Sequence, residues 1–245
     1  LPNGKYQTGA QIYTTLYSSN NWWSQLTSNN LVYKSDGFIA VNPTANWDAS
    51  CVLTGGACES TGENSVTAQA PEQRKIITFN GTEGVPFRWE DGISSTQQGY
   101  LDAGDSKGKQ RLNYLRGDRS NELTSAGNGL FRVRKSVLGD IINSSPAWVG
   151  PPSAYTGVSP WADKLNPTAT LAENSSTGQS YSAFRSSYNN RQNMVYVGSN
   201  DGLLHGFRSG AYDSTGSQYE PTAAMPNDGR EMLAFMPASI LKKIH

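Results

Sequence analysis

The cysteines and histidines of this chain are its best candidates for redox, metal or nucleophilic chemistry. Cys51 and Cys58 bracket a short glycine-containing loop, which can bring two Cα atoms within disulfide range. Closing so small a loop would stabilise the fold by roughly 2–3 kcal/mol. The alternative is a pair of free thiols in a cytosolic protein. A zinc site would need nearby histidines, and the two in the chain are His205 and His245. We favour the disulfide.

The triplet Arg116-Gly117-Asp118 spells the tripeptide that integrins read. A receptor motif would need the Arg and Asp side chains to splay from an exposed loop tip. The triplet instead follows a predicted helix, where Gly117 suits a left-handed cap and Asp118 can accept from the following backbone N–H groups. We favour the structural cap and keep the receptor motif as the alternative.

Asp102 and Asp105 are the nearest approach to a calcium loop. They lie in LDAGDSKGK, which lacks the alternating Asp and Asn residues and the distal Glu of an EF-hand loop. We therefore favour a solvated turn, and Asp102 and Asp105 stay weak metal candidates.

Enzyme signatures are few. The sequence contains no G-x-S-x-G elbow, no H-E-x-x-H pair and no P-loop. A nucleophile and base would have to rely on His205, which falls in a predicted strand and suits a packed or edge position. No catalytic residue is assigned, and we do not expect an enzyme.

The overall composition is polar but nearly neutral. The chain has 245 residues, Lys+Arg 20 against Asp+Glu 20 and a formal net charge of +0, so no general attraction to nucleic acid or anionic lipid is expected. Charged residues make up 16%, below the roughly 25% usual for soluble domains. This balance suits an extracellular β-rich protein. No apolar run approaches the roughly 18 residues of a membrane-spanning helix.

Alternating apolar and polar residues predict strands throughout the first part of the chain. The predicted strands are residues 11–17, 31–33, 38–41, 47–53 and 74–79. From residue 91 the pattern changes, and residues 94–100 and 109–116 lack strand alternation. Leu112 and Leu115 fall on one helical face, so a small helical insert is predicted there.

The clearest local signal is a β-hairpin over residues 194–207. Val195 and Val197 would share one face, and residues 199–202 supply Asn-Asp-Gly turn chemistry. Gly206 in the return strand, residues 203–207, predicts that another backbone or a large side chain packs close to it. Further β segments are predicted at 137–142, 147–149 and 231–240, with long polar loops over 151–190 and 209–228.

Four of these segments supply the strands of one propeller blade. They are residues 145–149, 194–198, 203–207 and 231–237. We predict a mainly β fold, a partial β-propeller with a small helical insert, rather than a sandwich. The predicted division is 1–90 for entry strands, 91–135 for the helical insert and 136–245 for the first blade with long loops. Since a ring has about 4–8 blades, we expect the remaining blades beyond His245.

Several motifs in order resemble one family. They are GVPFRWEDG (84–92), NYLRGDRSNE (113–122), LGDIINSSPAWVGPP (138–152), VYVGSNDGLLHGF (195–207) and GREMLAFMPASIL (229–241). Together they resemble the N-terminal part of the C-terminal propeller of the PilC/PilY family of type IV pilus tip-associated biogenesis factors and adhesins. WWSQL (22–26) departs slightly, because Ser24-Gln25 stands where Ser-Gly-Asp-Leu is expected.

The resemblance implies a protein exported through the periplasm to the cell surface at the pilus tip. It implies roles in pilus assembly, in counteracting retraction and in attachment. The implied partners are minor pilins of the tip complex and a host-cell receptor or surface, with no nucleic acid and no membrane-spanning segment. It also implies calcium for the full domain, whereas no cofactor is assigned to this segment. The alternative is part of a PQQ-dependent quinoprotein dehydrogenase, whose propeller carries a similar strand-turn-strand unit.

Overall fold

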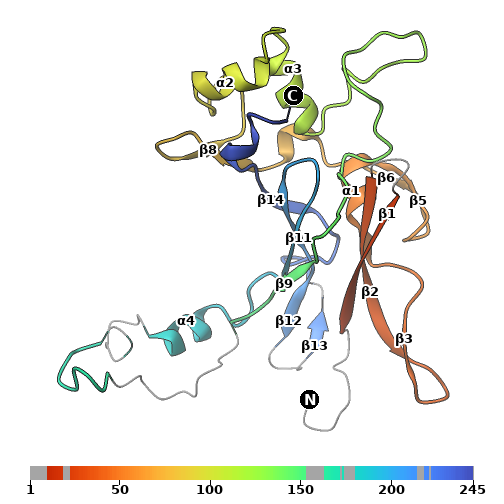
Figure 1. The fold of residues 1–245 in the computed structure, drawn as a ribbon. Coiled ribbons are helices and arrows are strands. Elements are labelled where there is room, and N and C mark those ends of the chain that lie inside the picture. Colours follow the sequence, from red (N-terminus) through yellow and green to blue (C-terminus); the bar gives the residue numbers. More distant parts are fainter. Residues whose placement is uncertain are drawn as a thin grey trace.

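The computed structural model describes residues 10–18, 23–152, 163–171, 173, 180–213, 218–220 and 222–244. Trp22 and His245, which entered the sequence analysis, lie outside these ranges, as do parts of the predicted loops. Figure 1 shows three neighbouring parts, with the N-terminal strands on the right, a central sheet and a helical part above it.

The N-terminal sheet is built on one long strand. β1 (Gln11–Ser18) pairs antiparallel with β2 (Trp23–Tyr33) along its whole length. β2 also pairs with β3 (Ile39–Val41) and β4 (Trp47–Asp48). The predicted strands at 11–17 and 38–41 are confirmed, while the predicted segment 31–33 is the end of an 11-residue strand.

The predicted strand over residues 47–53 is wrong beyond Asp48. A helix, α1 (Ala49–Thr54), begins there because the Asp48 carboxylate accepts a hydrogen bond from the Ser50 N–H at 2.8 Å, which is an N-cap. Gly55 ends the helix at φ +77°, a backbone conformation that glycine adopts without strain. Two short strands, β5 (Gly56–Cys58) and β6 (Glu63–Val66), and a 3₁₀ turn, η1 (Pro71–Gln73), follow.

The central sheet has six strands. Their order is β8 (Gly84–Pro86), β7 (Ile76–Phe79), β14 (Glu231–Phe235), β11 (Leu204–Arg208), β10 (Met194–Gly198) and β9 (Ala147–Val149). From β9 to β14 successive strands pair antiparallel, as predicted for a blade. β7 joins β14 in parallel, so a strand from the first 90 residues extends this sheet.

The predicted hairpin is confirmed at the centre of this sheet. Val195 and Val197 are 0% and 1% exposed. Gly206 lies directly opposite Tyr196, and a β-carbon added to Gly206 would lie 2.7 Å from Tyr196 Cε1. The close approach predicted from the glycine is therefore made by an aromatic ring.

The helical insert is also observed. α2 (Ser95–Asp102) begins with a capping box between Ser94 and Gln97, and α3 (Gly108–Leu115) buries Leu112. Both helices lie above the central sheet in Figure 1, close to the C-terminal end of the chain.

Residues 137–142 do not form the predicted strand. Their N–H groups bond to side chains instead of a neighbouring strand: Val137 N–H donates to Thr54 Oγ1 at 2.9 Å and Ile141 N–H to Ser24 Oγ at 2.7 Å. Val137, Leu138 and Ile141 are nevertheless buried, so their apolar pattern reports core packing rather than a strand.

The two predicted loops contain secondary structure of their own. α4 (Tyr181–Ser187) lies in the first, and the short hairpin of β12 (Ala211–Asp213) and β13 (Gln218–Glu220) in the second. β14 is shorter than the predicted strand 231–240 and is followed by a 3₁₀ turn, η3 (Ala238–Ile240). No helix within the described ranges is long and apolar enough to cross a bilayer.

Two apolar clusters hold these parts together. One joins the N-terminal sheet and α1 to the central hairpin through Trp47, Leu26 and Phe207. The other joins α2 and α3 to the remaining strands through Leu101, Leu112 and Ile76. The N-terminal sheet and the helices are therefore packed on the central sheet.

Candidate functional site

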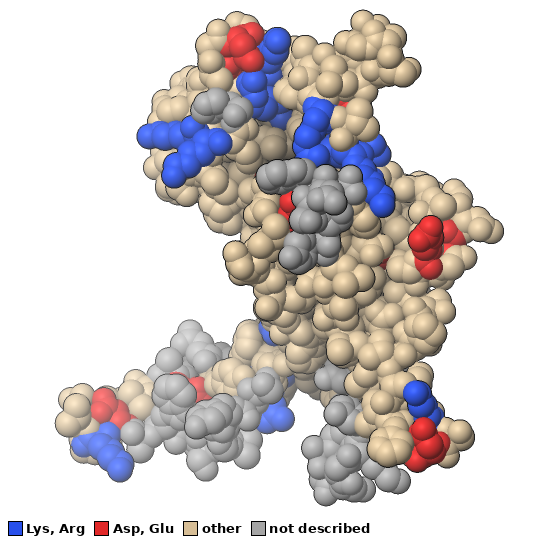
Figure 2. Space-filling model, turned by 45° about the vertical axis from the view of Figure 1, so that its right-hand side comes forward, with Lys and Arg blue, Asp and Glu red and all other residues tan. Residues whose placement is uncertain are grey.

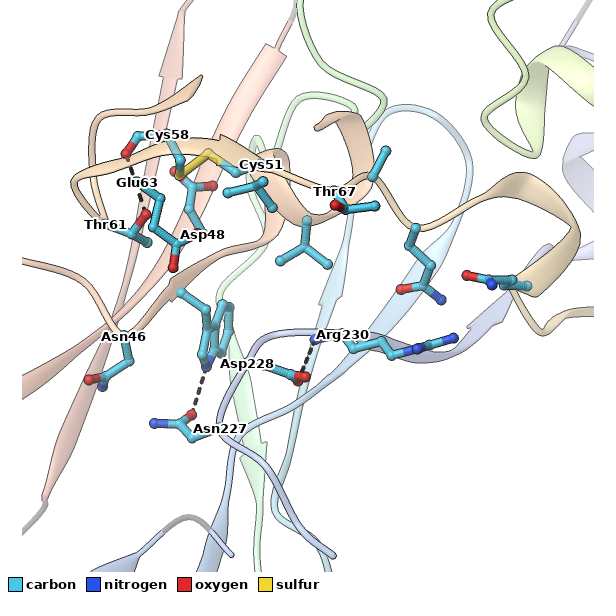
Figure 3. A pocket seen from close by; sticks show the side chains of 16 residues that line it. Asn46, Asp48, Cys51, Cys58, Thr61, Glu63, Thr67, Asn227, Asp228 and Arg230 are labelled. Carbon is cyan, nitrogen blue, oxygen red and sulfur yellow. Dashed lines mark hydrogen bonds between the residues drawn. A yellow bond between two sulfur atoms is a disulfide. The ribbon is translucent and has the colours of Figure 1, made fainter. Parts of the chain in front are cut away.

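A cavity of about 560 Å³ opens between α1, the β5–β6 hairpin and the segment that leads into β14. Figure 3 shows the disulfide along one wall and Asp228 and Arg230 on the opposite side, and Trp47 also lines the cavity. This volume falls within the range of small-ligand sites.

The wall of the cavity is fixed by the predicted disulfide. Cys51 in α1 is bonded to Cys58 in β5, with a Cα–Cα distance of 5.8 Å. The buried Asp48 carboxylate accepts hydrogen bonds from Ser50 Oγ at 2.6 Å and Ser60 Oγ at 2.8 Å. Asp48, Cys51 and Cys58 lie close enough together to hold a metal ion, but the disulfide leaves no thiolate to bind one.

The side of the cavity opposite the disulfide is polar. The Trp47 indole N–H donates to Asn227 Oδ1 at 2.8 Å. The Asp228 carboxylate is held by two hydrogen bonds of 2.6 Å from the Arg208 guanidinium, which lowers the pKa of Asp228 against the effect of burial. Among the described residues that line the cavity there is no histidine and no free thiol. The arrangement fits binding of a small polar ligand better than acid–base or nucleophilic chemistry.

A second constellation is buried beneath the central hairpin. The Arg74 guanidinium pairs with the Glu231 carboxylate at 2.6 Å, and Glu231 Oε1 lies 2.7 Å from Nδ1 of His205. On its other side, His205 Nε2 lies 3.0 Å from Asp201 Oδ2 and 3.0 Å from Ser199 Oγ. His205 and Glu231 side chains are both 0% exposed.

The distances from Ser199 to His205 to Glu231 resemble those of a nucleophile, a base and an orienting acid. Burial alone would lower the pKa of His205, but the charge of Asp201 and hydrogen bonds to Asp201 and Glu231 outweigh it and raise that pKa to about 9. The imidazole is therefore a cation at neutral pH, which cannot take a proton from Ser199. Ser199 Oγ also donates to Asp201. The arrangement fits a structural charge network, as expected for a packed His205.

The side chains of the Arg116-Gly117-Asp118 triplet do not splay outward. Arg116 is 6% exposed, and its guanidinium donates to the backbone oxygens of Phe87 at 3.0 Å and Pro71 at 2.6 Å. Gly117 has φ +106°, as a left-handed cap requires. Asp118 is half-buried and accepts from the Ser120 N–H at 2.8 Å. This geometry is the one expected from the cap interpretation.

The calcium candidates do not fit a calcium ion. Asp102 Oδ1 accepts from the Gly108 N–H at 2.8 Å, at the start of α3. Asp105 accepts from the Lys107 N–H at 3.0 Å and pairs with Arg111 at 2.8 Å. A calcium ion needs six to eight oxygen ligands that are free to turn toward it. Here the Asp102 carboxylate holds a backbone donor, and the Asp105 carboxylate holds a backbone donor and a guanidinium.

Basic side chains gather in the upper part of the face drawn in Figure 2, over the helical part, with smaller groups at the lower ends. Several are paired. Arg134 bonds to Glu122 at 2.8 Å and lies 3.7 Å above the Tyr114 ring, and Arg119 bonds to the same carboxylate at 3.1 Å. These cations therefore stabilise the segment after α3.

Sequence reasoning missed the cavity and most of the charge network. Arg74, His205 and Glu231 each stand at or in a predicted apolar strand, where a charge has to find a partner. A charged residue at or in an apolar strand was therefore the signal in the sequence for a buried charge network. Their pairing could not be read, because Glu231 lies 157 residues from Arg74.

Comparison with known proteins gives consistent results. Residues 138–244 match the sequence profile described as PilY1 beta-propeller domain. The type IV pilus biogenesis factor PilY1 of Pseudomonas aeruginosa strain PAK is 32% identical over 241 residues, which cover 95% of this chain and 16% of that protein. A PilY1 homolog of Xylella fastidiosa strain Temecula1 is 36% identical over 245 residues, covering 99% of this chain and 15% of that protein.

The chain thus spans about 16% of the length of the curated relatives it matches. No solved structure matches it.

Proposed function

This chain belongs to the PilY1 family, and we propose that it acts as a propeller segment of a type IV pilus biogenesis factor. The observation that carries the proposal is the 32% identity over 95% of the chain with a protein named for that function. Since the alignment includes the N-terminal sheet, the helical insert and the blade, the proposal concerns the segment as a unit.

We further propose that the segment supports pilus assembly, opposes retraction and contributes to surface attachment from the pilus tip. Its partners would be minor pilins of the tip complex and, for attachment, a host receptor or surface. The Cys51–Cys58 disulfide supports an exported protein, because disulfides form and persist outside the reducing cytosol. The polar cavity beside that disulfide is a candidate contact site.

A quinoprotein dehydrogenase is not favoured. The matching profile is that of the PilY1 propeller, and the relatives are named as pilus biogenesis factors rather than enzymes. The histidine that a catalytic mechanism would have needed is buried between the Asp201 and Glu231 carboxylates, and its raised pKa favours the protonated form. No reaction is proposed for this chain.

An in-frame deletion of the segment in its host tests this function. We expect few surface pili in an otherwise wild-type background and a recovery of pili when retraction is blocked, because the segment opposes retraction. Loss of pili in both backgrounds would assign it to assembly alone. Unchanged pili in both would contradict the proposal. Complementation with the intact gene, and with an Asp118→Glu variant as a matched control, excludes polar effects.

A further inference from the structure

Asp140 is a buried carboxylate that forms no ion pair with a described residue. It is 4% exposed, and its Oδ1 atom receives no hydrogen bond from the described chain. Three described side chains have such an enclosed and unpartnered polar atom, namely Trp23, Asp140 and Asn193, and only Asp140 carries a charge. Burial raises the pKa of Asp140, while the charge of Arg132 lowers it and that of Asp201 raises it further. Since a buried charge is costly unless it is paired, this carboxylate indicates a site for a cationic group.

The backbone around Asp140 is held by two neighbouring elements. The Asp140 carbonyl oxygen accepts a hydrogen bond from the Asn200 N–H at 2.8 Å, in the turn between β10 and β11. The next N–H along the chain, that of Ile141, donates to Ser24 Oγ on β2 at 2.7 Å. A ligand therefore meets a backbone that is already ordered, which lowers the entropy cost of binding.

Asp140 lines a cavity of about 320 Å³, which we call the Asp140 cavity. It lies where the two apolar clusters meet, because Val137 belongs to the cluster of the N-terminal sheet, while Leu115 and Ile244 pack against the cluster of the helices. Its volume falls within the range of small-ligand sites. Apolar side chains beside one buried carboxylate fit an aliphatic stem that ends in a cation.

The other charged side chains of the cavity have partners, with one exception. Arg134 pairs with Glu122 at 2.8 Å, and Asp201 pairs with His205 at 3.0 Å. Arg132 is exposed and forms no ion pair with a described residue. Within the described chain, the lining thus includes one unpaired buried carboxylate and one unpaired exposed guanidinium.

We propose that the Asp140 cavity binds the side chain of a lysine from a partner protein, with the ammonium group donating to the Asp140 carboxylate. An ammonium group is compact and needs one open acceptor oxygen. A guanidinium favours two parallel bonds, for which both carboxylate oxygens have to be open, and Oδ1 is enclosed. A free diamine fits less well, because its second ammonium group meets the like charge of Arg132.

A metal ion fits this cavity poorly. The second carboxylate in its lining, Asp201, already accepts from the N–H groups of Gly139 at 3.1 Å and Leu203 at 3.0 Å and pairs with His205. Binding a metal ion through Asp201 would break these bonds beside the Arg132 guanidinium. The inference concerns this cavity and not the pilus function, so failure of the deletion experiment leaves it standing.

Two model compounds test the proposal on the natural protein as its gene encodes it. Nα-acetyl-lysine N-methylamide carries the proposed group, and Nα-acetyl-norleucine N-methylamide has a similar stem without the charge. Ligand-observed saturation-transfer NMR measures the dissociation constant of each. The lysine compound should bind at least about tenfold more tightly, because it alone donates a hydrogen bond to a charged group. This comparison needs no variant, so it stands even where a variant fails to fold.

Three variants locate the binding. Asp140→Asn should weaken binding of the lysine compound at least about tenfold, and it should fold, as checked by near-ultraviolet circular dichroism, because no described partner is lost. Asp118→Asn removes a carboxylate outside the cavity and is the matched control, with unchanged binding expected. Arg132→Gln removes the competing cation and should strengthen binding about two- to fivefold at low salt.

Three results would contradict the proposal. The first is equal affinity of the two compounds for the wild type, or of the lysine compound for the wild type and Asp140→Asn. The second is tighter binding of putrescine than of the lysine compound, which would assign the cavity to a free diamine. The third is a loss of stability in Arg132→Gln without any gain in binding, which would show that Arg132 itself neutralises Asp140.

Discussion

Nδ1 of His205 lies 2.7 Å from Oε1 of Glu231, and both side chains are 0% exposed. A register shift between β11 and β14 at Gly206 and Phe207 accompanies this contact. Arg74, just before β7, pairs with the same carboxylate at 2.6 Å. One buried carboxylate thus connects three neighbouring strands of the central sheet, including the parallel strand that comes from the N-terminal part of the chain.

Replacing Glu231 by Gln should destabilise the protein strongly. The change removes one charge and leaves the Arg74 and His205 cations buried without it, which costs about 3–5 kcal/mol. Urea unfolding followed by tryptophan fluorescence measures the loss. Asp228→Asn, which breaks the more exposed Arg208 pair, is the matched control and should cost about 1 kcal/mol or less. Equal losses of stability for both variants would show that the buried network contributes no more than the more exposed Arg208–Asp228 pair.

Stability should fall at alkaline pH through His205. Its pKa is raised from 6.5 to about 9, so the folded protein holds a proton that the unfolded chain releases. The stabilisation is complete below about pH 6.5 and is lost as pH rises through about 9, at a slope of at most ~1.4 kcal/mol per pH unit. Unfolding free energies measured from pH 6 to 10 test this, and His205→Gln should flatten the curve.

Stability should also fall at acid pH, through Glu231. The pKa of Glu231 is lowered from 4.5 because the charge of Arg74 and the bonds to His205 and Arg74 outweigh burial. Its contribution is therefore present above about pH 4.5 and is lost as pH falls toward the folded-state pKa of about 2. Acid titration of the wild type and of Glu231→Gln should show a weaker pH dependence for the variant. Identical acid transitions would contradict the assignment.

Removing the disulfide should cost about 2–3 kcal/mol, because the bond closes a loop between residues seven positions apart. The double variant Cys51→Ser/Cys58→Ser avoids an unpaired thiol. Thermal unfolding with and without reductant should show a shift for the wild type and none for the variant. Mass spectrometry shows whether the reductant has opened the bond. If it has and the unfolding temperature of the wild type is unchanged, this account is contradicted.

Gly206→Ala should destabilise the hairpin. The new β-carbon would lie 2.7 Å from Tyr196 Cε1 and 3.3 Å from the Leu233 oxygen, and overpacking of this kind costs about 1–3 kcal/mol. Tyr196→Ala in the same chain should restore part of the lost stability, since it removes the aromatic ring that the new β-carbon would contact. A double-mutant cycle by urea unfolding measures the coupling, and additive effects would argue against this contact.

Substitutions at Arg116 and Asp118 distinguish the cap interpretation from the receptor motif. Arg116→Lys should lose about 1–3 kcal/mol, because a lysine cannot reproduce the guanidinium bonds to buried backbone oxygens. Asp118→Glu should leave stability and adhesion to integrin-bearing cells unchanged. Reduced adhesion by a folded Asp118→Glu protein would establish the receptor reading.

Sequence pattern was most informative where the cause is local. The hairpin at 194–207, the helix cap at Gly117 and the short Cys51–Cys58 loop all follow from neighbouring residues, and the structure shows each of them. The pattern failed at residues 137–142, where apolar side chains are buried but backbone donors bond to distant side chains. It also failed at Asp48, whose carboxylate begins a helix within a run that has strand character.

The sequence by itself therefore determined the class of fold, the blade strands and the family, because these depend on alternation, turn chemistry and ordered motifs. Only the tertiary structure decided that β7 joins the blade in parallel and that Arg74 and His205 share the Glu231 carboxylate. Those features join residues more than a hundred positions apart or depend on register across several strands, and neither is encoded in local periodicity.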